Sequence, residues 1–197
     1  MPRLSLRASV LALVLVAPLC AADTVSRSQV LDAIKTFDSN ASGSLVAGST
    51  PAQDDAVAKA SNVILKFSLE SDDVVVDLGM DSVPWCDVKK GLSTLSNSGA
   101  RGLLLAAYLS GSVHAQLSAG RQDPNPYAGW VSMLKVYRAL KMREGVKIPE
   151  VEGLLARQAE GTLQAYAATA MQRSADTLRR TYGQPGSRQI LTASSQP

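Results

Sequence analysis

Two residue types that build many active sites are scarce in this chain of 197 residues, which contains two cysteines and one histidine. So few nitrogen and sulfur donors cannot supply the usual ligands of a zinc site. The CxxCH signature of attached haem, a phosphate-binding glycine loop and a GxSxG nucleophile elbow are also missing from the sequence. We therefore expect no metal and no cofactor, and we favour a non-enzymatic function.

Long hydrophobic runs are scarce as well, and the clearest one lies near the N-terminus. Residues 8–17, ASVLALVLVA, follow Arg3 and Arg7 and precede small residues up to Ala22. This order is typical of a secretory signal peptide, and the apolar part is shorter than the roughly 20 residues of a membrane span. We expect cleavage near Ala22 and a mature protein in the periplasm or outside the cell. The alternative is a lipid anchor on Cys20, which follows the apolar run.

Charge is modest overall but unevenly distributed. Residues 23–87 contain eleven acidic and four basic side chains, whereas residues 88–197 contain six acidic and fourteen basic ones. The basic residues are spread out without a recognisable nucleic-acid motif, so we do not expect nucleic acid as a partner. Either the two parts fold against each other, or their surfaces attract different partners.

Apolar residues recur at helical spacing along most of the chain, and the alternation typical of strands is nearly absent. This pattern predicts an all-α fold, a single irregular helical bundle of about five to six helices. The predicted helices cover residues 25–38, 51–70, 85–95, 101–117, 127–143 and 150–182. We expect one domain over 23–182, after a signal peptide over 1–22 and before a disordered tail over 183–197.

The segment over 101–117 is the most apolar part of the expected mature chain, which predicts a buried central helix. Ala107, Gly111 and Ala115 are spaced four apart along it. This spacing predicts a stripe of small residues where a neighbouring helix approaches closely. The long C-terminal helix over 150–182 is predicted from a continuous apolar stripe.

The stretch ESDDVVVDLGMDSVP at 70–84 interrupts the helical pattern. Its valines favour a strand, but the sequence offers no partner strand. Its acidic residues lack the alternating spacing and the glycine of a calcium loop. We expect an extended, solvated linker that carries Asp72, Asp73, Asp77 and Asp81.

Cys86, within SVPWCDV at 82–88, is the one cysteine expected in the mature chain. A thiol nucleophile needs a neighbouring base or cation, and His114 is the only histidine. A Cys86–His114 dyad is therefore the one catalytic pairing that the sequence permits, and a cysteine-dependent enzyme is the alternative function. We favour a buried thiol for Cys86, and a disulfide-linked dimer through this residue is a third interpretation.

Three aromatic residues share one face of the helix predicted over 127–143: Tyr127, Trp130 and Tyr137. Such a face lies either in the core or at a binding surface, where tyrosine and tryptophan are enriched. We select these three residues as candidates for binding. The resulting hypothesis is an exported, non-enzymatic helical module that binds a protein partner in the cell envelope or a small apolar ligand.

One known class of proteins is compatible with this hypothesis. The YLSG step at 108–111 is similar to a Y-x-x-G helix in one family of small periplasmic immunity proteins, which neutralise delivered toxins. That family usually carries paired cysteines, which the expected mature chain lacks. We therefore assign no family on this likeness.

Overall fold

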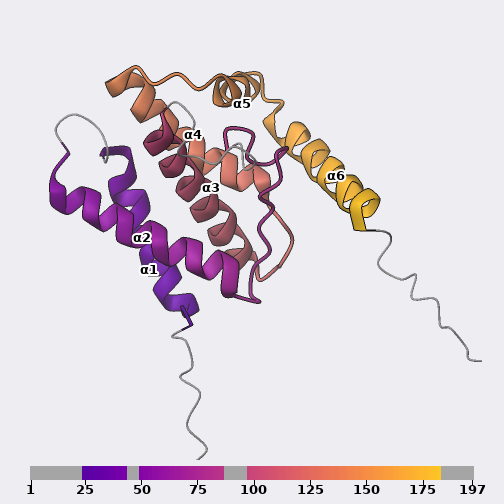
Figure 1. The fold of residues 1–197 in the computed structure, drawn as a ribbon, viewed down its shortest axis with the longest axis horizontal. Coiled ribbons are helices and arrows are strands. Elements are labelled where there is room, and N and C mark those ends of the chain that lie inside the picture. The colour runs from indigo at the N-terminus through magenta and orange to yellow at the C-terminus, as the bar shows by residue number, and fades with distance from the viewer. Residues whose placement is uncertain (1–23, 44–48, 87–96, 183–197) are drawn as a thin grey trace, which may run out of the picture.

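The computed structural model describes residues 24–43, 49–86 and 97–182 (Figure 1). Within these ranges the chain forms six α-helices, one 3-10 turn and no β-strand, which confirms the predicted all-α bundle. The elements are α1 (Arg27–Asn40), η1 (Ala41–Gly43), α2 (Pro51–Glu70), α3 (Ser98–Ala119), α4 (Pro126–Glu144), α5 (Pro149–Ala159) and α6 (Leu163–Tyr182). The predicted signal peptide, the alternative anchor at Cys20 and the predicted tail over 183–197 lie outside the described residues.

Prolines mark the starts of three helices. Pro51, Pro126 and Pro149 occupy the first turns of α2, α4 and α5. Proline suits this position because the first N–H groups of a helix have no partner inside the helix. Thr50 and Asn125, the residues before the first two prolines, each accept a hydrogen bond from a backbone N–H of the helix that follows. The predicted bounds of the second helix consequently match α2 at both ends.

Helix α3 lies at the centre of the bundle (Figure 1). It packs most extensively on α4, and α1 and α2 form a pair that covers another of its sides. Helices α5 and α6 follow on the side of α4. The largest side chains in the core are fully buried: Trp85, Trp130, Tyr108, Tyr137, Phe37 and Phe67. Twelve residues of α3 are buried, which confirms the predicted buried central helix.

Helices α3 and α4 approach closely where each carries a glycine. A Cβ atom at Gly111 would lie 2.5 Å from the backbone oxygen of Ala128 and 2.6 Å from the Cβ of Ser132. A Cβ atom at Gly129 would likewise collide with the ring of Tyr108. The close helix contact predicted from the small residues of α3 is therefore confirmed at Gly111.

The C-terminal helix predicted over 150–182 is in fact two helices. Helix α5 ends at Ala159 and α6 begins at Leu163, with Gly161 between them at a φ of +71°. The left-handed backbone interrupts the helical hydrogen bonds, and glycine adopts it without a steric penalty. Buried apolar residues continue across the break: Val151, Leu154, Leu163, Ala167 and Ala170. The apolar stripe alone therefore did not reveal where the helix stops.

Residues 71–86, which we call the connector, follow α2 and form neither helix nor strand. They are irregular, in line with the predicted linker, but they are only partly solvated: Asp72 and Asp73 are exposed, whereas the buried residues are Val74, Ser82, Val83, Trp85 and Cys86. Trp85 and Cys86 lie in the connector, and the rest of the helix predicted over 85–95 falls outside the described residues.

Side chains of α3 and α4 bind the backbone of the connector. The Gln116 amide accepts from the N–H of Val75 at 2.9 Å and donates to the Val75 carbonyl oxygen at 2.9 Å. Nε1 of Trp130 donates to the carbonyl oxygen of Ser82 at 2.7 Å. A segment without secondary structure needs such partners, because a buried backbone N–H or C=O that bonds to nothing is costly.

Two of the four aspartates of the connector, Asp77 and Asp81, have side-chain partners. The Asp77 carboxylate accepts hydrogen bonds from Gly79 N at 2.8 Å and from Ser82 Oγ at 2.7 Å. Asp81 lies 3.4 Å from Arg173 of α6. The prediction of a solvated acidic linker therefore holds for Asp72 and Asp73, which are exposed, and fails for the second half of the segment, where Asp77 and Asp81 and the backbone find partners.

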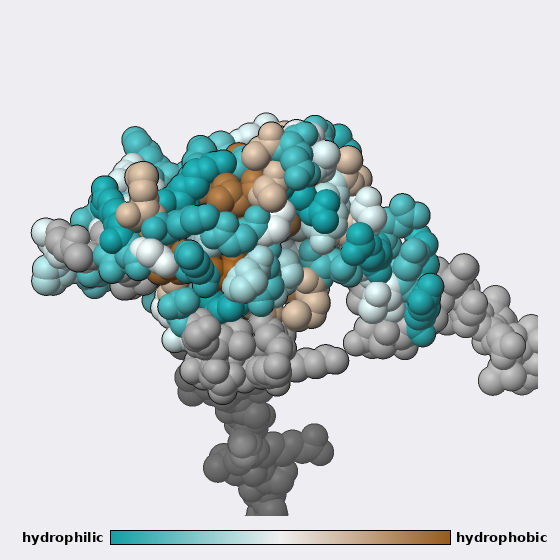
Figure 2. Space-filling view, turned by 90° about the horizontal axis from the view of Figure 1, so that it is seen from above, coloured by the Kyte–Doolittle hydropathy of each residue, from teal (hydrophilic) through white to brown (hydrophobic). Residues whose placement is uncertain are grey.

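The face of the molecule seen from above in Figure 2 is largely hydrophilic, and hydrophobic residues show only in small patches. The exposed large hydrophobic residues include Leu69 on α2 and Met142 on α4. None of the helices described here combines the length and the apolarity that crossing a bilayer requires.

Candidate functional site

Of the three aromatic residues selected for binding, only Tyr127 reaches the surface, with 38% of its area exposed. Trp130 and Tyr137 have no exposed area. The Trp130 ring stacks on Tyr166 of α6, with ring centroids 5.6 Å apart. The selection of Trp130 and Tyr137 as surface contacts therefore does not hold, because the face that they share is covered in the folded chain.

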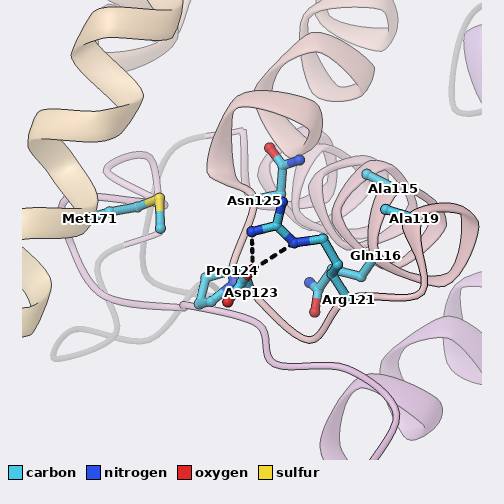
Figure 3. A pocket seen from close by; sticks show the side chains of 8 residues that line it. All are labelled: Ala115, Gln116, Ala119, Arg121, Asp123, Pro124, Asn125 and Met171. Atoms are coloured by element: carbon cyan, nitrogen blue, oxygen red, sulfur yellow. Dashed lines mark hydrogen bonds and ion pairs between the residues drawn. The ribbon is translucent and has the colours of Figure 1, made fainter.

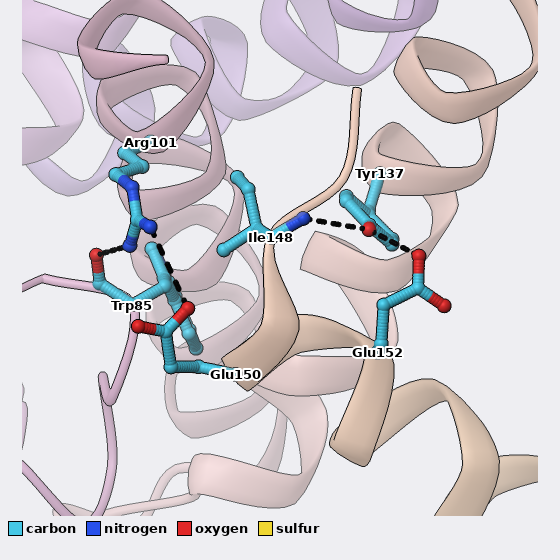
Figure 4. A network of polar contacts seen from close by, with 6 residues as sticks. All are labelled: Trp85, Arg101, Tyr137, Ile148, Glu150 and Glu152. Carbon is cyan, nitrogen blue, oxygen red and sulfur yellow. Dashed lines mark hydrogen bonds and ion pairs between the residues drawn. The ribbon is translucent and has the colours of Figure 1, made fainter. Parts of the chain in front are cut away.

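Tyr137 belongs to a polar network between α4 and α5 (Figure 4). Its hydroxyl donates to Oε1 of Glu152 at 2.5 Å and accepts from the N–H of Ile148 at 3.2 Å. Nζ of Lys141 lies 2.7 Å from Oε2 of the same carboxylate. The bonds from Lys141 and Tyr137 lower the pKa of Glu152, and burial with the bond to Glu152 raises the pKa of Tyr137 to about 12. Because these groups satisfy one another, their role is structural.

Cys86 is a free thiol with 4% of its area exposed. Burial raises its pKa to about 12, although the positive charge of Arg101 acts in the opposite direction. Arg101 itself donates to the carbonyl oxygen of Trp85 at 2.5 Å and lies 3.5 Å from Glu150 (Figure 4). A thiol with so high a pKa is not a nucleophile at neutral pH. The structure thus places Cys86 in the core, and a disulfide-linked dimer through it would require local opening.

The structure does not bring Cys86 and His114 together. Cys86 lies in the connector, close enough to the start of α3 for Arg101 to influence its pKa. His114 is exposed and follows Arg101 by thirteen residues on α3. Thirteen residues correspond to about 20 Å along a helix axis. The one catalytic pairing that the sequence permits is therefore not assembled in this structure.

His114 instead lines a hollow of about 470 Å³ between α1, α3 and the N-terminal half of α4, which we call the polar groove. Its polar lining consists of Asp38 from α1, Ser110 and His114 from α3, and Asn125, Tyr127 and Lys135 from the cap and body of α4. Gly111 and Ala128, which form the close contact between α3 and α4, also line the groove. Three separate helices therefore contribute to one site.

The charged groups of the polar groove have few partners within the protein. Ser110 Oγ donates to Oδ1 of Asp38 at 3.2 Å. Burial of this carboxyl group raises the pKa of Asp38, and the bond from Ser110 and the charges of Lys135 and His114 oppose the shift. Lys135 and His114 form no hydrogen bond or ion pair with any other residue that the structure describes. These groups are therefore available to a ligand.

A second hollow, of about 460 Å³, lies between the end of α3, the loop before α4, and α6; we call it the α6 crevice (Figure 3). It is lined by Gln116, Ala119, Arg121, Asp123, Asn125 and Met171. Arg121 and Asp123 pair with each other at 2.6 Å, and Met171 faces the loop from α6. Ala115 and Asn125 line both hollows, so the polar groove and the α6 crevice adjoin.

The polar groove offers an acid, an imidazole, an ammonium group and a phenol, which suits the binding of a polar partner. No group of three or more His, Cys, Asp or Glu side chains that could hold a metal ion occurs within the described ranges. The sequence analysis missed Asp38 and Lys135, because they come from different helices and no local motif marks them. Comparisons with protein-family models, curated proteins and solved structures found no match for this chain.

Proposed function

We propose that the protein is an exported, non-enzymatic helical module that binds a protein partner in the cell envelope through the polar groove. The observation that carries this proposal is the set of unpartnered groups in the groove. Lys135 and His114 form no hydrogen bond or ion pair with another described residue, and they line the same hollow as Tyr127, which is 38% exposed. Export rests on the signal peptide predicted from residues 1–22.

The size and lining of the polar groove support this function. The groove has a volume of about 470 Å³, so it accommodates more than one side chain of a partner. Tyrosine is enriched among the residues that dominate binding at protein interfaces. The groove combines apolar residues with charges of both signs, which favours a protein partner over the small apolar ligand that the sequence also allowed.

Photo-cross-linking in the native envelope tests the proposal. A photoreactive phenylalanine derivative at Tyr127 should capture a defined protein. The same group at Met142, which lies on α4 outside the groove and is 84% exposed, is the matched control and should not capture it. Identical adducts from both positions would contradict the proposal, because they would report only general exposure.

Direct binding of the captured and purified partner then tests the individual residues. We expect Tyr127→Ala to weaken binding about tenfold, the effect of losing a contact worth about 1.4 kcal/mol at the interface. Met142→Ala should leave the affinity unchanged. Cys86→Ala should also retain the partner, whereas a cysteine-dependent function would lose its activity in this variant.

A further inference from the structure

Helix α6 is anchored to the bundle mainly through roughly its first two turns. Its buried residues, Leu163, Ala167 and Ala170, all lie there, and no later residue of α6 whose side chain the structure describes is buried. Two of these three residues are alanines, which remove little apolar area from water. The helix stands at the edge of the molecule, and its C-terminal end points away from the other helices (Figure 1). Hydrophobic burial therefore holds α6 less firmly than it holds the central helix α3.

One contact of α6 covers a buried tryptophan of α4. Tyr166 stacks on Trp130, with ring centroids 5.6 Å apart. Trp130 has no exposed area, and its Nε1 donates to the carbonyl oxygen of Ser82 at 2.7 Å, so the indole is tied to the connector as well as to α4. When α6 moves, the Tyr166 ring leaves with it, and one face of the Trp130 indole meets water.

The outer half of α6 contacts the connector through polar groups. Nη1 of Arg173 lies 3.4 Å from Oδ1 of Asp81, and both side chains are partly exposed. Such an ion pair stabilises little, because water screens it. Ser174 lies beside Gly79, where an added Cβ atom would be 3.0 Å from the Ser174 Oγ. These contacts separate at low cost, because the groups that they release meet water.

The turn between α5 and α6 has room to change its conformation. Gly161 has a φ of +71°, and a Cβ atom there would meet nothing within 4 Å. Two backbone hydrogen bonds close the turn, from Gly161 N to Gln158 O at 3.2 Å and from Thr162 N to Arg157 O at 2.9 Å. Hinges in proteins are usually a few residues at the ends of helices or strands that absorb changes in φ and ψ. The turn at Gly161 has these properties.

The α6 crevice adds a place where α6 lacks packing. Of the described residues that line this hollow of about 460 Å³, only Met171 belongs to α6. Met171 faces Pro124 and Arg121 of the loop before α4 across the hollow (Figure 3). The loop therefore does little to hold the helix in place, and a movement of α6 changes the width of the crevice.

We propose that α6 is a hinged cover, a helix that swings as one unit about the turn at Gly161 between the closed position of the structure and an open one. In the open position the α6 crevice is wider and one face of Trp130 is accessible. Tryptophan is enriched among the residues that dominate binding, so the open protein presents an aromatic surface that the closed protein hides. None of the described residues that line the polar groove belongs to α6, so this inference does not depend on the proposed function.

Thiol labelling of the full chain tests whether α6 opens by itself. Ala167→Cys places a thiol on the covered side of α6, and Ala60→Cys places one at a similarly buried position of α2. Iodoacetamide reacts with each native variant, and mass spectrometry follows the peptide that carries the new thiol. We expect position 167 to be labelled about tenfold faster than position 60, or more, because opening of α6 needs less free energy than global unfolding. Urea below the unfolding transition should change the rate at 167 little, because the opening exposes little surface.

The free energy of unfolding of each variant is measured as well, so that destabilisation by the added sulfur atom is not mistaken for opening. Equal labelling rates at the two positions, both rising steeply with urea, would overturn the hinged cover. Such a result would mean that α6 leaves the bundle only when the whole protein unfolds.

A disulfide between α6 and the connector provides the second test. The 3.0 Å between an added Cβ atom at Gly79 and the Ser174 Oγ is close to the distance from a Cβ atom to the far sulfur of a disulfide. Gly79→Cys with Ser174→Cys should therefore hold α6 closed after oxidation. Combined with Ala167→Cys, the oxidised pair should slow labelling at 167 about tenfold, and reduction should restore the rate. Equally fast labelling at 167 in both forms would overturn the proposal, because the thiol would then be reached without movement of α6.

Discussion

The two faces of α3 use their polar side chains in different ways. On the side of the connector, the Tyr108 hydroxyl donates to a connector carbonyl oxygen at 2.9 Å, and Gln116 bonds both backbone groups of Val75. On the side of the polar groove, Ser110 makes one bond at 3.2 Å, and His114 has no partner among the described residues. Most buried polar groups in folded proteins are hydrogen-bonded, because leaving them unpaired costs stability, and exposed ones need not be. The polar side chains on the connector side therefore stabilise the fold. On the groove side, His114 keeps hydrogen-bonding groups that no described residue uses.

The largest expected effect concerns the thiol on the connector side. Its pKa of about 12, against the ordinary 9.0, reduces the thiolate fraction at pH 8 about a thousandfold. We therefore expect a thiol reagent to modify Cys86 about a thousand times more slowly in the native protein than in urea. The measurement is the rate of absorbance change with a chromogenic disulfide. Comparable rates in both states would show that the connector does not bury the thiol.

The contact between α3 and α4 should be the part most sensitive to an added methyl group. We expect Gly111→Ala to destabilise the protein by about 2 kcal/mol, because its Cβ would meet the backbone of Ala128 at 2.5 Å. Gly102→Ala on the same helix is the matched control: a Cβ there meets nothing within 4 Å, and it should stabilise the helix by up to about 1 kcal/mol. Urea unfolding measures both. Equal effects would mean that the close crossing is absent.

Loss of the Gln116 amide should release the connector. We expect Gln116→Leu to cost about 1 kcal/mol, because the partly exposed backbone groups of Val75 would lose their protein partner and turn to water. Amide hydrogen exchange at Val75 should accelerate. Gln164→Leu on the exposed side of α6 serves as the control and should change neither quantity. Unchanged exchange at Val75 would argue against the paired contact.

Acid stability should depend on Glu152, a polar residue with structural partners like those of the connector face. Its pKa is lowered from the ordinary 4.5, so the stabilisation is fully present above pH 4.5 and is lost as the pH falls through the lowered value. We expect Glu152→Gln to flatten the acid limb of the stability curve. The effect should stay below about 1 kcal/mol, because the group is partly exposed and screened by solvent. Unfolding midpoints between pH 2 and pH 7 measure it, and identical limbs would contradict the assignment.

The smallest effects should come from the groove side. We expect Lys135→Ala and His114→Ala each to change the free energy of unfolding by less than about 0.5 kcal/mol, because both side chains are exposed and neither forms a hydrogen bond or ion pair with another described residue. Thermal and urea unfolding of the two variants provide the measurement. A loss of more than about 1 kcal/mol in the free energy of unfolding would show that these groove residues stabilise the fold. The two faces of α3 would then not differ in the way described.

Helix positions were predictable from the sequence where local chemistry marks them. The threonine and proline at 50 and 51 mark the start of α2, and the apolar segment over 101–117 identifies the central helix. The break at Gly161 was not predictable from the apolar stripe, because the stripe continues on both sides of it. A glycine inside a helical pattern is a weak signal, and only the backbone conformation shows that it ends the helix.

The candidate site was less predictable than the fold. Periodicity placed Tyr127, Trp130 and Tyr137 on one face, but it could not show that α5 and α6 cover most of that face. Asp38 and Lys135 meet in the polar groove although they are almost a hundred residues apart in the chain. Their proximity depends on how three helices pack against one another, and no local sequence motif predicts it. The composition of the connector likewise suggested a solvated segment. The hydrogen-bond partners of its backbone belong to helices far away in the sequence, so composition could not reveal them.

The few partners of the polar groove have a consequence for how this protein can change over generations. Most substitutions that reach an internal contact cost stability, and a protein near its stability threshold cannot accumulate many of them. Lys135 and His114 form no hydrogen bond or ion pair in the described fold, and they act on it only through the charge that they place near Asp38, so substitutions there cost little stability. Mutations at these positions can therefore drift and be selected for a new partner while the helical scaffold stays intact. The groove is the part of the molecule where recognition can diverge fastest.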